Sequence, residues 1–60
     1  MNFIAFDRKT GMIRCFKDTH VVCAMRSQLV NINADGDLVS FIKERGGVAA
    51  AISFILNKIQ

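Results

Sequence analysis

The sequence lacks proline, tryptophan and tyrosine, and it has only four glycines among its 60 residues. This composition excludes collagen-like, proline-rich and low-complexity chains. Hydrophobic residues make up 52% of the chain and charged residues 22%, a balance typical of a folded globule rather than a disordered chain. We therefore expect residues 1-60 to form a single small domain, with a β-rich half over 1-33 and a helical half over 34-60.

Long hydrophobic runs are also missing. The most apolar stretch covers residues 46–56, whereas a membrane-spanning helix needs about 20 apolar residues. The first residues, MNFIAFDRKTG, contain acidic and basic side chains and no apolar core of a secretory signal. These features predict a cytoplasmic chain that makes no membrane contact.

Cysteine is scarce, with Cys15 and Cys23 as the two examples. In a cytoplasmic chain, two cysteines predict free buried thiols rather than a disulfide. With His20 they form the spacing C-x4-H-x2-C, which matches none of the common zinc patterns. We therefore expect no metal site at these residues.

Two glycine-containing segments fail as ligand sites. Asp35-Gly36-Asp37 begins like a calcium loop, but Gly46 stands where such a loop needs its final glutamate. Gly46-Gly47 precedes a predicted helix but lacks the further glycines and the lysine of phosphate-binding motifs. We expect no cofactor.

Catalytic residues are few. His20 is the single histidine, and Cys23 is the nearest nucleophile to it in sequence. A chain of this length has little material left to enclose a water-excluding pocket once it has formed a core. The sequence therefore predicts a protein that is not an enzyme.

The first third of the chain predicts a β-hairpin over residues 2–17. The segments NFIAFD and MIRCFK are apolar runs of strand length, joined by the loop 8–11. Gly11 suits a left-handed position in that loop, and the Asp7 carboxylate can bind the turn backbone. A four-residue loop places Asp7 opposite Met12 and Phe3 opposite Phe16. Both faces of this hairpin are largely apolar, so we expect both to be covered.

Residues 20–33 fit two structures. HVVCAM and LVNIN can form two further strands, separated by a turn at residues 26–28. The same stretch also has a helical stripe formed by Val21, Met25, Leu29 and Ile32. The short turn at residues 18–19 favours a strand over 20–25.

The last third predicts two helices, over 37–45 and 48–59, separated by Gly46-Gly47. Asp37 is expected to cap the first, and Phe54 lies outside the apolar stripe of the second. The predicted fold class is α+β: an N-terminal β-hairpin, with three to four antiparallel strands in all, packed on two C-terminal α-helices. The segment 38–59 also resembles the helix-turn-helix of bacterial repressors. However, its second helix begins with Val48 and three alanines, which cannot read base edges.

Two functional hypotheses follow. A domain below about 70–80 residues usually needs a disulfide, a metal or a partner subunit for stability. The apolar excess therefore favours a homodimer, acting as a non-catalytic protein-binding or regulatory module of the accessory or inhibitor type found in phages and mobile elements. An unidentified larger protein would be its partner. The predicted contacts for this function are Ala50, Ser53, Phe54 and Lys58.

The alternative is nucleic-acid binding by the basic hairpin. Residues 1–33 contain five basic and two acidic residues, and this half accounts for the whole net charge of +3. Phe3 and Phe16 can stack on bases. The predicted contacts for this function are Arg8, Lys9, Arg14 and Lys17.

Overall fold

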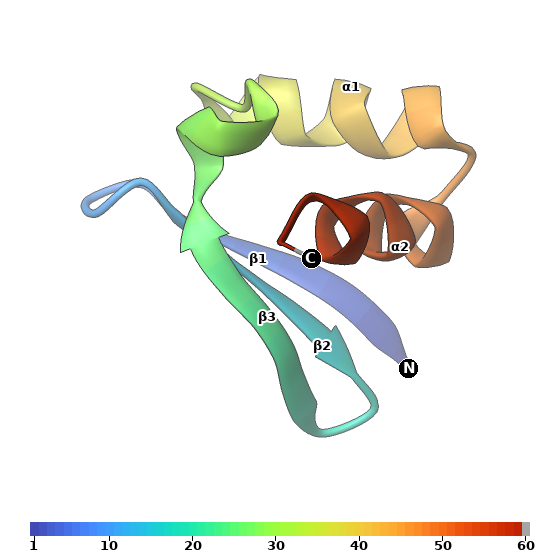
Figure 1. Ribbon diagram of the computed structural model, residues 1–60. Helices are drawn as coiled ribbons and strands as arrows, with labels where there is room; N and C mark the ends of the chain where they lie inside the picture. Colours follow the sequence, from blue (N-terminus) through green and yellow to red (C-terminus); the bar gives the residue numbers. More distant parts are fainter. Residues whose placement is uncertain (60) are drawn as a thin grey trace.

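The computed structural model describes residues 1–59 and contains a three-stranded antiparallel sheet followed by helices (Figure 1). The strands are β1 (Asn2–Asp7), β2 (Met12–Lys17) and β3 (His20–Arg26), in the order β1-β2-β3. A 3-10 helix, η1 (Ser27–Val30), leads to α1 (Asp35–Arg45) and α2 (Val48–Ile59). The predicted α+β fold is thus confirmed, with three strands.

The β1–β2 hairpin has the predicted register. Asp7 pairs with Met12 and Phe3 with Phe16. The Asp7 carboxylate accepts a hydrogen bond from the Lys9 N–H at 2.9 Å, and Gly11 adopts a left-handed conformation with φ 72°. The loop closes as expected because both residues favour this turn.

The strand interpretation of residues 20–25 is confirmed, and β3 extends to Arg26. The alternative helix over this stretch and a fourth strand over 29–33 are both wrong. The Ser27 N–H donates to the Gly11 carbonyl at 2.8 Å, and the Ile32 N–H donates to the Ser27 carbonyl at 3.0 Å. These bonds turn the chain at the end of β3 into η1, and Asn31 follows in a left-handed conformation.

The two predicted helices are present. Helix α1 begins at Asp35, two residues earlier than expected, so Asp37 lies within its first turn instead of capping it. The Asp37 carboxylate accepts a hydrogen bond from the Asn33 N–H at 3.1 Å. Gly46, with φ 97°, ends α1 in the left-handed conformation, and α2 has the predicted bounds.

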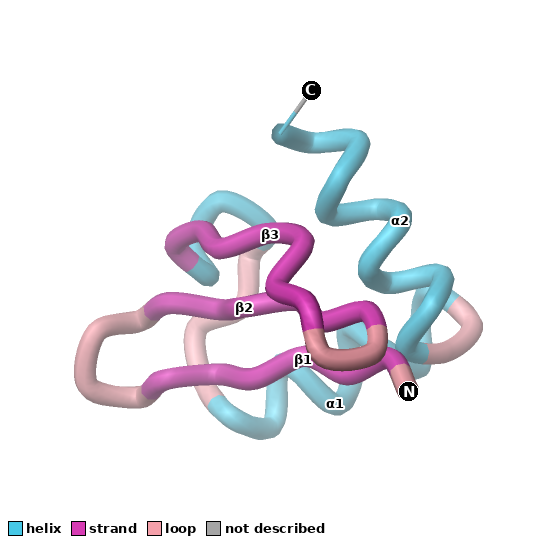
Figure 2. The backbone as a smooth tube through the Cα atoms, turned by 90° about the horizontal axis from the view of Figure 1, so that it is seen from below, coloured by secondary structure: helices cyan, strands magenta, loops and turns pink. Residues whose placement is uncertain are grey.

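All helices lie on one side of the sheet. The buried core joins this side of β2 and β3 to the inward faces of α1 and α2; its members are Ile13, Cys15, Cys23, Val30, Ile32, Phe41, Ala51, Ile52 and Ile55. In Figure 2, seen from below, the strands lie in front of α1. The expectation that both faces of the hairpin are covered is therefore wrong within the single chain, because both helices pack on the same face.

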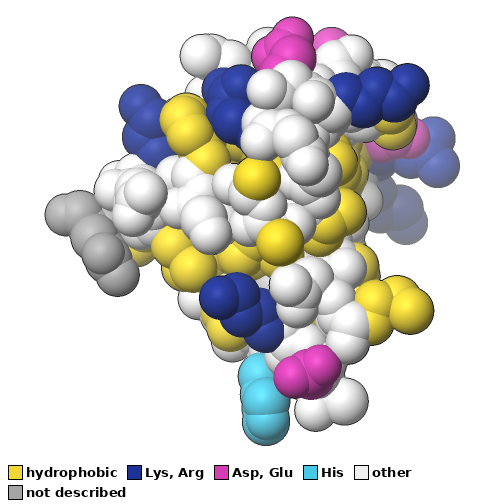
Figure 3. Space-filling model, turned by 90° about the vertical axis from the view of Figure 1, so that its right-hand side faces the viewer, with side chains coloured by type: hydrophobic (Ala, Val, Ile, Leu, Met, Phe, Trp, Pro, Cys, Tyr) yellow, Lys and Arg dark blue, Asp and Glu magenta, His cyan; other side chains and the backbone are white. Residues whose placement is uncertain are grey.

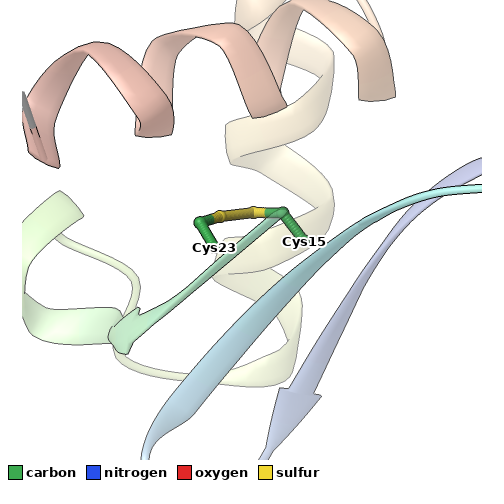
Figure 4. Close-up of a disulfide and its surroundings, with 2 residues drawn as sticks. All are labelled: Cys15 and Cys23. Carbon is green, nitrogen blue, oxygen red and sulfur yellow. A yellow bond between two sulfur atoms is a disulfide. The ribbon is translucent and has the colours of Figure 1, made fainter. Parts of the chain in front are cut away.

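Cys15 and Cys23 form a disulfide in the structure, so the expectation of free thiols is wrong (Figure 4). They are directly opposed on β2 and β3, and their Cα atoms lie 5.1 Å apart. Both side chains are buried on the helix side of the sheet. The sequence did not predict the pairing because it depends on the β2–β3 register.

No helix among residues 1–59 has both the length and the apolar character needed to cross a membrane.

Candidate interaction surface

The sheet leaves the face opposite the helices open to solvent. Side chains alternate along a strand, so Ile4, Ile13 and Cys15 point toward the helices and their neighbours point away. We define the outer sheet face as the exposed or half-buried residues at these alternate positions: Phe3, Ala5, Asp7, Met12, Arg14, Phe16, Val21, Ala24 and Arg26. This is a largely apolar surface with two arginines and one aspartate.

Two aromatic rings stack on the outer sheet face. The centroids of Phe3 and Phe16 are 4.3 Å apart, and their planes differ by 9°. Phe3 remains 44% exposed and Val21, opposite Phe16, is 53% exposed. The strand pairing shifts register between Cys15 and Phe16, which leaves Val22 without a partner and places Val21 opposite Phe16. The face therefore presents two stacked rings with an aliphatic neighbour.

Of the two arginines of the outer sheet face, Arg14 lies beside this patch and Arg26 lies at the other end of the face, opposite Met12. Arg14 is in the middle of the central strand, between Ala5 on β1 and Ala24 on β3, and Arg26 lies at the end of β3. Both are exposed. Three of the five acidic residues in the sequence, Asp35, Asp37 and Glu44, lie on α1, on the helix side of the sheet. The sheet side is consequently the basic side.

The side view in Figure 3 supports a mixed surface. Hydrophobic side chains lie across the middle of that view, with Lys and Arg side chains above and below them. Exposed apolar, basic and acidic groups are thus neighbours on this side of the molecule.

The structure does not bring the four predicted nucleic-acid contacts together. Arg14 lies on the outer sheet face, whereas Arg8 and Lys9 are in the hairpin loop and Lys17 is at the opposite end of β2. The Arg8 guanidinium pairs with the Asp35 carboxylate at 3.1 Å, with the Arg8 side chain still 80% exposed. The sequence pattern does not single out Val21 or Arg26, because only the β2–β3 register places them opposite Phe16 and Met12.

The predicted protein contacts lie on α2, in two different environments. Ala50, Ser53 and Lys58 are exposed. Phe54 is half-buried, and its ring meets the Phe41 ring edge-on at a centroid distance of 5.6 Å. Although Phe54 lies outside the apolar stripe of its own helix, it therefore packs between α1 and α2.

Arg45 completes this aromatic cluster. Its guanidinium carbon lies 4.7 Å from the Phe41 ring centroid and 4.2 Å from that of Phe54. The Lys58 ammonium lies 5.7 Å from the Phe54 centroid. A shallow pocket of about 290 Å³ opens beside Arg45; its lining also includes Val30, Asn31, Asp37, Ser40, Phe41 and Glu44. The pocket lies on α1, away from the outer sheet face.

The candidate catalytic pair from the sequence does not form a reactive site. His20 is exposed at the start of β3, opposite Lys17, while Cys23 is buried in the disulfide. Within residues 1–59, no three histidine, cysteine or acidic side chains are grouped so that they could hold a metal ion.

Comparison with protein-family profiles, curated proteins and solved structures finds no match to this chain.

Proposed function

We propose that this protein is a small non-catalytic binding module that engages its partner through the outer sheet face. The observation that supports this most directly is the open position of the stacked Phe3 and Phe16 rings, on strand positions that alternate with those facing the core. A contiguous apolar surface on a protein is a frequent site of association. The module is of the accessory or regulatory type, as small proteins of phages and mobile elements are.

The same proposal includes a homodimer formed through α2. Ala50 and Ser53 are small and exposed, so another backbone can approach this helix closely. A dimer interface on α2 leaves the outer sheet face free for the partner. Phe54 contributes to this surface from its half-buried position, and the exposed Lys58 has its ammonium 5.7 Å from the centroid of that ring.

We also place the module in the cytoplasm. Cytoplasmic glutathione and thioredoxin keep most protein thiols reduced, so the Cys15–Cys23 pair would be a dithiol there for much of the time. Alkylation of free thiols in acid-quenched host cells measures this directly. A fully alkylated pair supports the cytoplasmic location, and a fully protected pair contradicts it.

Two valines with matched exposure test the binding surface. Val21 on the outer sheet face is 53% exposed and Val39 on α1 is 54% exposed. A tagged chain carrying Val21→Glu should lose its partner when recovered from its own host, whereas the chain carrying Val39→Glu should retain it. Equal loss in the two variants, or retention by Val21→Glu, would contradict the proposed surface. Circular dichroism first establishes that both variants are folded.

A further inference from the structure

We infer that the partner of the outer sheet face is single-stranded nucleic acid. This inference rests on the proposed function and names the class of molecule that its surface fits. Single strands bind proteins by stacking their bases on aromatic side chains, while basic side chains contact the phosphates. Both groups are present on this face, within one three-stranded sheet.

The geometry of the two phenylalanines suits base stacking. Because the Phe3 and Phe16 rings are nearly parallel, at 9°, a base can continue the stack on an outer ring face. The 44% exposure of Phe3 leaves room for it. Base faces are accessible in single strands and hidden in a duplex, so an apolar aromatic patch favours the unpaired form.

The charges distinguish nucleic acid from a second copy of the chain. Arg14 lies in the middle of the outer sheet face, with alanines opposite it on both neighbouring strands. If two copies packed through this face, the central Arg14 would be buried with no acidic residue opposite it, and the one carboxylate of the face, Asp7, already accepts a hydrogen bond from the Lys9 N–H in the hairpin loop. A buried charge without a counter-charge is strongly unfavourable. A phosphate backbone supplies the opposite charge at this position.

The distribution of charge over the whole chain agrees with this choice. The segment that forms the sheet and its loops has five basic and two acidic residues, including Arg8 and Lys9 in the hairpin loop and Lys17 at the other end of β2. Because Arg8 is paired with Asp35, Lys9 and Lys17 are the side chains that extend the basic surface beyond the two ends of the Phe3–Phe16 patch. A strand that crosses the face can therefore contact basic groups on either side of the stacked bases.

The test uses the full chain and measures the fluorescence anisotropy of labelled 15-nucleotide oligo(dT) and oligo(U). We expect saturable binding that weakens as the salt concentration rises. Phe3→Leu keeps an apolar side chain but removes the ring, and it should weaken binding about five-fold or more. Arg14→Gln should weaken binding. It should also reduce the slope of log affinity against log salt concentration by about one, the loss expected for one phosphate contact.

Lys43→Gln is the matched control for Arg14→Gln, because Lys43 is an exposed basic residue on α1. It should leave oligonucleotide affinity within about two-fold of the unmodified chain. Equal weakening by Lys43→Gln and Arg14→Gln would indicate attraction by net charge alone and would overturn the inference. Absence of saturable binding to both oligonucleotides at low salt would overturn it too.

Nuclease treatment separates this inference from the proposed function. In recovery from the host, nuclease should release the partner from the unmodified chain. If the partner resists nuclease but is still lost in Val21→Glu, the outer sheet face binds a protein: the inference then fails while the proposed function stands. If Val21→Glu retains the partner, the proposed function fails as well.

Discussion

At the scale of single residues, Arg45 shows how one side chain can join two helices. Its guanidinium stacks on Phe41 of α1 and Phe54 of α2, and these two rings also meet edge-on. Stacked cations and aromatic pairs each add stability beyond the area they bury. The cluster therefore fixes the α1–α2 contact at the end of α1.

Replacing Phe54 tests this contact. Phe54→Ala should lower the free energy of unfolding by about 2 kcal/mol or more, because it removes the ring from both Phe41 and Arg45. Phe54→Leu should lower it less, and Ser53→Ala, at the exposed neighbouring position, should change it by no more than about 0.5 kcal/mol. Urea unfolding measures all three. An unchanged midpoint for Phe54→Ala would contradict the prediction.

The cysteine pair provides the second prediction at this scale. The disulfide closes a short segment, with a sequence separation of 8, so reduction should lower the free energy of unfolding by about 2 kcal/mol through loop-closure entropy. Urea unfolding with and without reductant measures the difference. The double variant Cys15→Ala/Cys23→Ala should not respond to reductant at all. A reductant effect in that variant, or none in the unmodified chain, would contradict the prediction.

At the scale of the elements, the turns depend on backbone conformations that few residues adopt. Gly11 has φ 72° in the hairpin loop, whereas Gly36 lies in the first turn of α1 without a positive φ. The space around them does not distinguish the two sites. An added Cβ would meet the Ser27 hydroxyl at 4.0 Å at Gly11 and nothing within 4 Å at Gly36.

Alanine at these two positions should therefore have opposite effects. Gly11→Ala should destabilise the protein by about 1 kcal/mol or more, because a left-handed backbone disfavours a Cβ atom. Gly36→Ala should be neutral or stabilise it by up to about 1 kcal/mol, since alanine favours the helix. Thermal unfolding of the two variants is the measurement. The same sign for both would indicate that φ does not control the hairpin loop.

At the scale of the whole molecule, the sheet and the helices present surfaces of different composition. The outer sheet face is apolar and basic, while α1 contains most of the acidic residues and α2 presents small exposed side chains. Such a division allows one surface to bind a partner while another binds a second copy.

Sedimentation tests the homodimer. At micromolar concentration the unmodified chain should sediment at twice 6.7 kDa, and Ala50→Arg should shift it toward the monomer by blocking close approach at α2. Val39→Arg adds the same charge on α1 and should leave the dimer intact. A monomer for the unmodified chain would contradict the prediction. A monomer for both variants would show that the dimer interface is not confined to α2.

Interactions between residues close in sequence account for the local structure of most of this chain. The hairpin register followed from Asp7 and Gly11, because a short loop with these residues leaves few ways to pair its strands. The end of α1 and the start of α2 followed from Gly46-Gly47, because a left-handed glycine ends a helix. These features depend on interactions between residues close in sequence, which a pattern reveals directly.

Contacts between distant parts of the chain establish which surfaces are open and which residues meet. The β2–β3 register joins Cys15 to Cys23 and brings Val21 beside Phe16, and the hydrogen bonds of Ser27 end the sheet after its third strand. Phe54 packs inward because α1 places Phe41 and Arg45 against it. The outer sheet face is open because both helices fold back to the same side. Each outcome depends on contacts between separate elements, and an apolar strand has the same sequence whether one of its faces is covered or both are.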